Sequence, residues 1–268
     1  MMRYLPFGLK GAIILSAAFC LHLGATAIAA DLPEVEPAPL PAPSEERWEF
    51  AFAPYLWAAG LEGTVAQFGL DPTDIDLGFS DILENLDIAF MGVAEARRGR
   101  FGVAGDIVYT KLSGGGRGPG GVFSASLENQ LFVGTAMAEY RVIQDGRSSV
   151  DVMAGARVWS VDTDVRITAG VGAGFSASDS ATWVDPMIGV KGRWQGASPW
   201  YLTGWGMVGG FGVSSDIDWD VMAGAGYEYR DWLSFVAGYR ALGVDYQDGA
   251  FVWDTVMHGP FVGSVFRF

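Results

Sequence analysis

The feature that most limits the possible folds is a strict alternation of side-chain character, sustained over runs of roughly ten to fifteen residues. At residues 216–230, the alternating sets are Asp216, Asp218, Asp220, Met222, Gly224, Gly226, Glu228 and Arg230, and Ile217, Trp219, Val221, Ala223, Ala225, Tyr227 and Tyr229. A period of two places these sets on opposite faces of a β-strand. Globular strands average about five or six residues, whereas about 9–11 residues are needed to cross the hydrocarbon core of a bilayer. We therefore expect an all-β fold, a transmembrane antiparallel up-and-down β-barrel with apolar side chains outward and polar side chains in the lumen.

Two other fold classes share part of this pattern. A soluble β-sandwich also alternates, with its apolar face inward, but its strands are shorter. A helical membrane protein is suggested by residues 194–215, which carry no charge. Six glycines interrupt that segment, and each interior glycine costs a helix about 1 kcal/mol relative to alanine. The segment is therefore not a helical span.

A short repeat indicates the number of strands. An x-Glu-x-Arg ending occurs at residues 94–97, 138–141 and 227–230, and residues 191–193 and 266–268 occupy equivalent places without the Glu. Five such endings imply five hairpins and about ten strands, with short turns on the periplasmic side and longer loops outside. We expect these strands near residues 47–59, 86–97, 101–113, 128–142, 149–162, 181–194, 199–212, 216–229, 232–246 and 251–268. Eight strands, or twelve if residues 61–68 and 72–79 pair as an extra hairpin, are the alternatives.

The start of the chain has the pattern of an export signal. Arg3 and Lys10 precede an uncharged stretch that closes with Ala27-Ile28-Ala29, the small-x-small pattern of a signal peptidase site. We expect residues 1–29 to be a signal peptide rather than a retained anchor. Residues 30–46 contain five prolines and form an expected extended periplasmic segment. The barrel would then span residues 47–268.

Composition excludes several function classes. The chain carries 31 acidic and 17 basic residues, a formal net charge of −14, so a nucleic-acid-binding role is disfavoured. A single cysteine excludes a disulfide framework and a cysteine-based zinc site. We expect no cofactor, no metal site and no catalytic residues. Asp216, Asp218 and Asp220 share one strand face, and we expect them to be hydrated or paired with arginine rather than bound to a cation.

The lumen face carries a set of charged residues. We expect these to form a structural salt-bridge network rather than a selectivity ring, because narrow barrels fill their interior with side chains. The set comprises Glu95, Arg97, Glu139, Arg141, Arg157, Arg193, Glu228, Arg230, Arg240 and Arg267. The first loop, residues 60–85, includes a predicted short helical turn at residues 80–86 capped by Ser80 or Asp81. We expect this loop to fold over or into the barrel mouth.

The end of the chain carries a resemblance. Residues 259–268, which finish in Phe266-Arg267-Phe268, resemble the C-terminal strand of proteobacterial outer-membrane β-barrels. Residues 81–99 and 238–254 also resemble a family of small, largely uncharacterised outer-membrane proteins. The resemblance implies an outer-membrane location in a Gram-negative bacterium and contact with outer-membrane lipid. It further implies that Phe266 and Phe268 are an assembly signal for the barrel-assembly machinery, and it carries no catalytic residues.

The expected function is non-enzymatic: a structural, surface-interaction or minor permeability role in the cell envelope. A narrow, porin-like diffusion channel for small solutes is the first alternative. The second is an outer-membrane lipid hydrolase, in which His258 would be the base, Ser264 or Ser234 the nucleophile and Asp254 the orienting acid. The residues leave the oligomeric state and the surface partners open.

Overall fold

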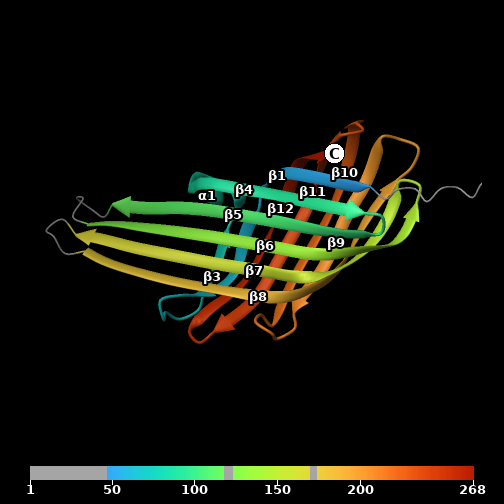
Figure 1. Ribbon diagram of the computed structural model, residues 1–268. Coiled ribbons are helices and arrows are strands. Elements are labelled where there is room, and N and C mark those ends of the chain that lie inside the picture. The colour runs from blue at the N-terminus through green and yellow to red at the C-terminus, as the bar shows by residue number, and fades with distance from the viewer. Residues whose placement is uncertain (1–46, 118–122, 170–173) are drawn as a thin grey trace, which may run out of the picture. The chain divides into compact units, whose positions relative to one another are not determined.

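The alternating segments form long antiparallel strands (Figure 1). The computed structural model describes residues 47–117, 123–169 and 174–268, so the expected signal peptide and Pro-rich segment lie outside the described residues. One helix occurs in the described part of the chain, α1 (Phe79–Glu84). The strands in the same part are β1 (Trp48–Trp57), β2 (Gly60–Ala66), β3 (Thr73–Leu77), β4 (Leu86–Arg98), β5 (Phe101–Arg117), β6 (Phe123–Asp145), β7 (Ser148–Ala169), β8 (Gly174–Gln195), β9 (Trp200–Gly210), β10 (Ile217–Arg230), β11 (Leu233–Asp248) and β12 (Phe251–Arg267).

A barrel closes because the first and last of these strands pair. β1 is antiparallel to β12, from Ala51 opposite Arg267 to Trp57 opposite Phe261, and its other edge pairs with β4. The remaining neighbours, β4 to β12, follow chain order. The predicted ten-stranded barrel is therefore confirmed. We call the end with the short turns after β4, β6, β8 and β10 the turn end, and the opposite end the loop end.

Two further strands come from the first loop. β2 pairs with the loop-end half of β12, and β3 pairs only with β2. The extra hairpin considered from the sequence is thus present, but it extends the sheet beyond β12 instead of enlarging the barrel. Ala58 and Ala59 form a short irregular link between β1 and β2, beside Gly259 of β12. A Cβ atom at position 259 would lie 2.0 Å from the carbonyl oxygen of Ala58. Only glycine fits this close backbone approach.

The strands β5 to β8 are longer at the loop end than expected. β6 and β7 pair from Asp145 opposite Ser148 to Phe123 opposite Ala169, whereas the sequence predicted ends at residues 128 and 162. The outward-facing apolar residues stop near these predicted ends. Beyond that point the outward positions are polar, such as Asp162 on β7 and Ser180 on β8, but backbone pairing continues.

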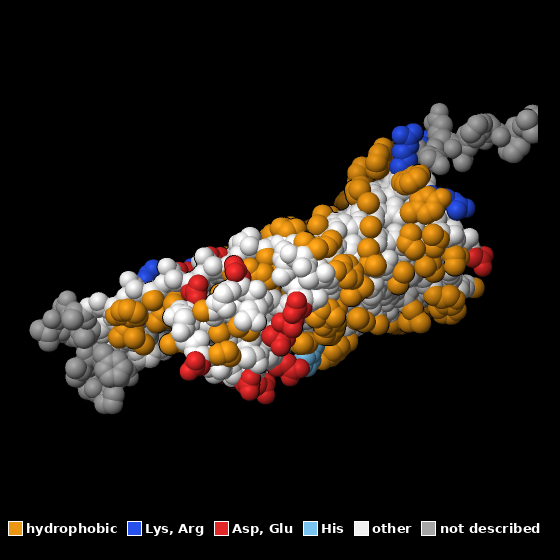
Figure 2. Space-filling view, turned by 90° about the horizontal axis from the view of Figure 1, so that it is seen from below, with side chains coloured by type: hydrophobic (Ala, Val, Ile, Leu, Met, Phe, Trp, Pro, Cys, Tyr) orange, Lys and Arg blue, Asp and Glu red, His pale blue; other side chains and the backbone are white. Residues whose placement is uncertain are grey.

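The exterior carries an apolar belt around the turn-end half of the barrel, and Figure 2 shows these side chains gathered toward one end of the molecule. On β10, Val221 is 50% exposed, whereas Asp218 and Asp220 are completely buried. The apolar face therefore points outward, as expected. Aromatic residues of the belt near the turn end include Trp48, Phe50, Tyr140, Trp194, Trp200 and Tyr229, in keeping with an interfacial girdle. Within the described ranges, no helix has the length and apolar character needed to cross a bilayer.

The first loop crosses the barrel opening. The backbone N–H of Phe68, at the tip of the β2–β3 hairpin, donates to Asp179 Oδ2 on β8 at 2.5 Å. The predicted helical turn is present as α1, but it begins after Gly78, not at Ser80 or Asp81. The Asp81 carboxylate instead accepts a hydrogen bond from the Gly78 N–H at 3.0 Å, because an acidic side chain at the third helical position can reach back to the cap.

Candidate functional site

The lumen is the candidate site, and its deepest layer is a buried network of ions. Arg157 on β7 contacts Asp218 at 2.6 Å and Asp220 at 2.8 Å, both on β10. Arg240 on β11 contacts the same Asp220 at 2.7 Å and Asp106 on β5 at 2.5 Å. These contacts join four strands across the lumen. All five side chains are buried: Arg157, Asp218, Asp220 and Arg240 are at most 1% exposed, and Asp106 is 7% exposed.

Neutral donors complete this layer. Trp159 Nε1 donates to Asp218 at 2.8 Å, and Trp205 Nε1 donates to Asp220 at 2.9 Å. The hydroxyl of Tyr55 donates to Asp106 at 2.8 Å and accepts from Arg240 at 2.5 Å. Burying ions is costly unless the geometry is good and the remaining lone pairs are satisfied. Here the ion pairs have short distances and the remaining carboxylate oxygens accept hydrogen bonds. The layer therefore connects β5, β7, β10 and β11 across the lumen.

The sequence located only part of this layer. Arg157 and Arg240 were expected in the lumen, whereas Asp106 was not singled out. Asp218 and Asp220 are paired with arginine, one of the two roles expected for them, while Asp216 is exposed at the loop end of β10. Their inward direction was readable from the alternation, but their partners were not. In the described part of the chain, no group of three or more His, Cys, Asp or Glu side chains is arranged to hold a metal ion.

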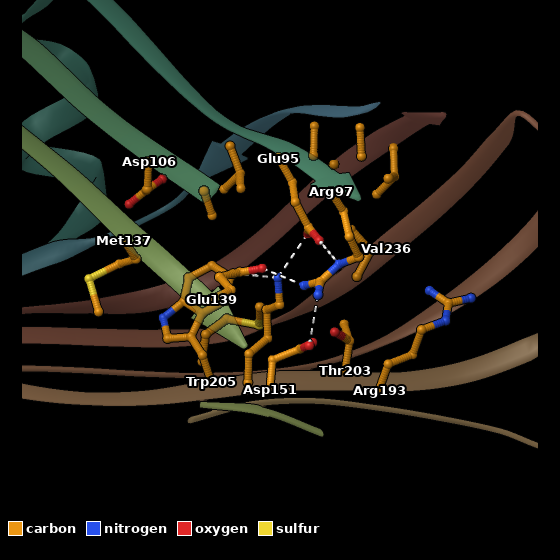
Figure 3. Close-up of a pocket in the computed structure, with 18 of the residues that line it drawn as sticks. Glu95, Arg97, Asp106, Met137, Glu139, Asp151, Arg193, Thr203, Trp205 and Val236 are labelled. Carbon is orange, nitrogen blue, oxygen red and sulfur yellow. Dashed lines mark hydrogen bonds and ion pairs between the residues drawn. The ribbon is translucent and has the colours of Figure 1, made fainter. Parts of the chain in front are cut away.

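A second charged layer lies closer to the turn end. Arg97 contacts Glu95 at 2.9 Å, Glu139 at 2.6 Å and Asp151 at 3.1 Å (Figure 3). Lys191 on β8 contacts Glu95 at 2.8 Å and Glu139 at 2.6 Å. The sequence analysis did not assign Lys191 or Asp151 to the network, although both occupy inward positions of the strand alternation.

Arg141 extends this layer by contacting Asp151 at 3.0 Å. Nearer the turn end, Glu228 contacts Arg193 at 2.8 Å and also pairs with Arg147. Contrary to expectation, neither Arg230 nor Arg267 forms an ion pair with a described residue, although Arg267 does line the lumen. A register shift between Glu228 and Arg230 ends the regular ladder, so Arg230 is exposed and lies over the Tyr229 ring.

Apolar side chains fill the lumen on the loop-end side of the buried ions. The rings of Trp159 and Trp183 are stacked with their centroids 5.8 Å apart. The Trp183 ring also stacks on Tyr246 of β11, at 3.9 Å and an interplanar angle of 1°. Trp159 and Val161 are completely buried. This apolar cluster, defined by Trp159, Val161, Trp183 and Tyr246, packs with Leu131, Val133, Val244 and Trp253 in one core.

On the turn-end side, a cavity of about 600 Å³ remains. One wall carries the second charged layer, including Glu95, Arg97 and Lys191. The other wall is apolar and includes Met222, Val236 and Phe261 from β10, β11 and β12. Residues at the turn end of β1 and β12, among them Phe50, Arg267 and Phe268, line the cavity and place its mouth at the turn end. The volume lies within the range of about 300–1,000 Å³ for small-molecule sites.

The residues considered for hydrolysis are not brought together. His258 lies on the exterior of β12, where its Nδ1 is 2.6 Å from the Tyr239 hydroxyl and its Nε2 is 3.5 Å from Glu62. Ser264 is six residues farther along the same strand, about 20 Å away at about 3.3 Å per residue. Ser234 is completely buried and bonds to the Tyr201 hydroxyl at 3.0 Å.

The two residues expected as an assembly signal lie at the closing seam. Phe268 pairs with Phe50 through the backbone, with its N–H 2.9 Å from the Phe50 oxygen, and its side chain is 78% exposed. The Phe266 ring stacks on Trp232 with centroids 6.3 Å apart. The backbone of this segment closes the barrel, whereas the Phe268 side chain is left accessible.

Comparison with known proteins shows a likeness of structure. No protein-family model matches the sequence, and no curated protein matches it. The solved structure of the outer-membrane protease OmpT from Escherichia coli is 10% identical, with a TM-score of 0.51 over 83% of this chain and 97% of that chain. The chain has the fold of an outer-membrane β-barrel. Together with the apolar belt, this fold places the barrel in an outer membrane.

Other outer-membrane structures match over a similar share of the chain with lower scores. The attachment invasion locus protein Ail of Yersinia pestis is 12% identical, with a TM-score of 0.33 over 83% of this chain and 99% of that chain. The translocator domain of the autotransporter NalP from Neisseria meningitidis is 15% identical, with a TM-score of 0.41 over 83% of this chain and 89% of that chain.

Proposed function

We propose that this protein is a non-enzymatic surface protein of the outer membrane, with a barrel that anchors an extracellular sheet and does not conduct solutes. The observation that carries the proposal is the filled lumen. The Trp159–Trp183–Tyr246 stack spans the lumen from β7 and β8 to β11. The fully buried Arg157 lies next to it on the turn-end side. An aqueous path through the barrel would have to displace both layers.

The strands beyond the apolar belt support a surface role. With the turn end on the periplasmic side, β5 to β8 project outward from the membrane. On β7, ten residues follow Trp159 up to Ala169, a length of about 33 Å at about 3.3 Å per residue. This sheet presents polar side chains such as Glu128, Asp162 and Thr182. This sheet is available for contact with molecules outside the cell.

Conductance of the purified protein in planar lipid bilayers tests the closed lumen. We expect no stable single-channel steps from the wild-type protein, because side chains occupy the bore. A Trp183→Ala/Tyr246→Ala double variant removes the aromatic stack and is expected to give measurable steps. The matched control is Trp200→Ala, which removes an aromatic ring from the exterior and leaves the lumen unchanged.

Steady conductance of the wild-type protein would overturn this proposal and favour the narrow diffusion channel. That alternative is supported by the cavity, which already occupies the periplasmic half of the lumen. The hydrolase alternative has less support, because His258 contacts Tyr239 and Glu62 instead of a serine. We further propose that outer-membrane lipid surrounds the belt and that the barrel-assembly machinery recognises the C-terminal strand.

A further inference from the structure

The periplasmic cavity contains one cation without a described partner. Every other basic side chain of its lining is paired: Arg97, Arg141, Lys191, Arg193 and Arg240 each contact at least one carboxylate. Arg267 forms no ion pair with any described residue, and its Nη1 atom is buried without a hydrogen-bond partner. A buried donor left without a partner destabilises the folded state, because it has lost its water and gained no hydrogen bond in return. This guanidinium is therefore the group in the cavity with unused binding capacity.

The surroundings of Arg267 favour an anion over a further protein contact. Arg193 lines the same cavity as Arg267, so a second guanidinium group borders this space. The carboxylates of Glu49 and Asp231 also line the mouth, but both residues are exposed and neither pairs with Arg267. A carboxylate or phosphate placed beside Arg267 would satisfy its free donor with a charge-assisted hydrogen bond.

The apolar wall of the cavity favours a ligand whose remaining part is also apolar. From Arg267, the inward positions of β12 lead through Val265 and Gly263 to Phe261, which packs beside Val236 and Met222. Deeper in the cavity, Met137, Met153 and Met207 form a second apolar cluster with Met187. Methionine side chains adapt to ligands of different shape. The space next to Arg267 is thus lined for an aliphatic group.

We propose that the cavity binds a small amphipathic anion from the periplasm. Its acidic head would bind Arg267, with Arg193 close by, and its aliphatic part would lie on the wall formed by Met222, Val236 and Phe261. The aromatic stack lies on the loop-end side of the cavity, and the cavity mouth lies at the turn end. The site does not depend on the surface role proposed above, and it would remain if the barrel were found to conduct.

Calorimetric titration of the full chain in phosphatidylcholine nanodiscs tests the site, with empty nanodiscs subtracted. We expect saturable binding of octanoate, and no saturable binding of octanol or octylammonium. Arg267→Gln should weaken octanoate binding at least about tenfold, because it removes a charge-assisted contact. Arg230→Gln is the matched control, since it removes the same charge at the same end outside the lumen, and its affinity should be unchanged.

A second variant keeps the test decisive if Arg267→Gln does not fold. Val236→Trp fills the cavity and leaves both arginines in place, and it should abolish octanoate binding. Equal binding to the wild-type protein and both cavity variants would overturn the proposal. Inorganic phosphate binding as tightly as octanoate would overturn the apolar part of the site. In nanodiscs containing phosphatidylglycerol, unchanged octanoate affinity supports a soluble ligand, whereas weaker binding would assign the site to a lipid headgroup instead.

Discussion

At the scale of single residues, the lumen pairs charges that are far apart in the sequence. Arg240 is separated by 134 residues from Asp106 and by 20 from Asp220, yet it contacts both inside the barrel. Removing one member of a buried ion pair leaves an uncompensated charge and costs about 3–5 kcal/mol, far more than the pair itself contributes. The consequence is that stability depends on each of these residues individually.

We expect Arg240→Met to lower the free energy of unfolding by about 3–5 kcal/mol, because Asp106 and Asp220 remain buried without this partner. Urea unfolding in detergent, followed by tryptophan fluorescence, measures the change. Arg147→Gln is the control, since the Arg147 side chain is 57% exposed in its pair with Glu228, and its effect should be under about 1 kcal/mol. Similar losses in both variants would contradict the buried network.

At the scale of the strand, adjacent residues face different environments, the apolar exterior and the lumen. On β4, Ala94 is exposed on the apolar exterior, whereas Val93 lines the cavity and lies opposite Asp106 of β5. The alternation in the sequence predicted this difference correctly, because the side-chain period of a strand is two. It did not predict where β5 to β8 end. These strands continue past the apolar belt with polar outward side chains, and their backbones stay paired there.

We expect Ala94→Arg to prevent assembly or to destabilise the barrel by about 2–4 kcal/mol, the cost of a cation facing lipid near mid-depth. Val93→Arg places the same side chain in the cavity near Asp106 and should be tolerated. The folded fraction of each variant on unheated electrophoresis gels, where a folded barrel migrates differently from the heated sample, gives the comparison. Equal folding of the two would show that the assigned faces are wrong.

At the scale of the whole molecule, barrel closure joins the two ends of the described chain. β12 pairs with β11 on one side and with both β1 and β2 on the other, so it completes the barrel and also carries the extra hairpin. The final residues contribute to closure mainly through their backbone, as the contact between Phe268 and Phe50 indicates. The exposed Phe268 side chain is therefore available for recognition during assembly.

We expect Phe268→Ala to reduce the amount of folded barrel in outer-membrane fractions while leaving the stability of protein refolded in detergent within about 0.5 kcal/mol of wild type. The reason is that a substitution at an exposed side chain has little effect on the folded state. Phe266→Ala is the comparison, because it also removes the stack on Trp232 and should lower stability in detergent. Loss of stability with Phe268→Ala, or normal assembly in cells, would contradict an assembly role for its side chain.

The sequence by itself determined the barrel, its strand number and the direction of most side chains, because these follow from local features: strand length, the repeated hairpin ending and a period of two. Val221 outside and Asp220 inside were both predictable from their places in the alternation. Only the tertiary structure decided that Asp220 meets Arg157 and Arg240, that Trp183 stacks on Tyr246, and that Arg267 has no described partner. These relations depend on strand register and on contacts across the lumen, where side chains from distant strands meet, and a local pattern contains no information about which residues face each other.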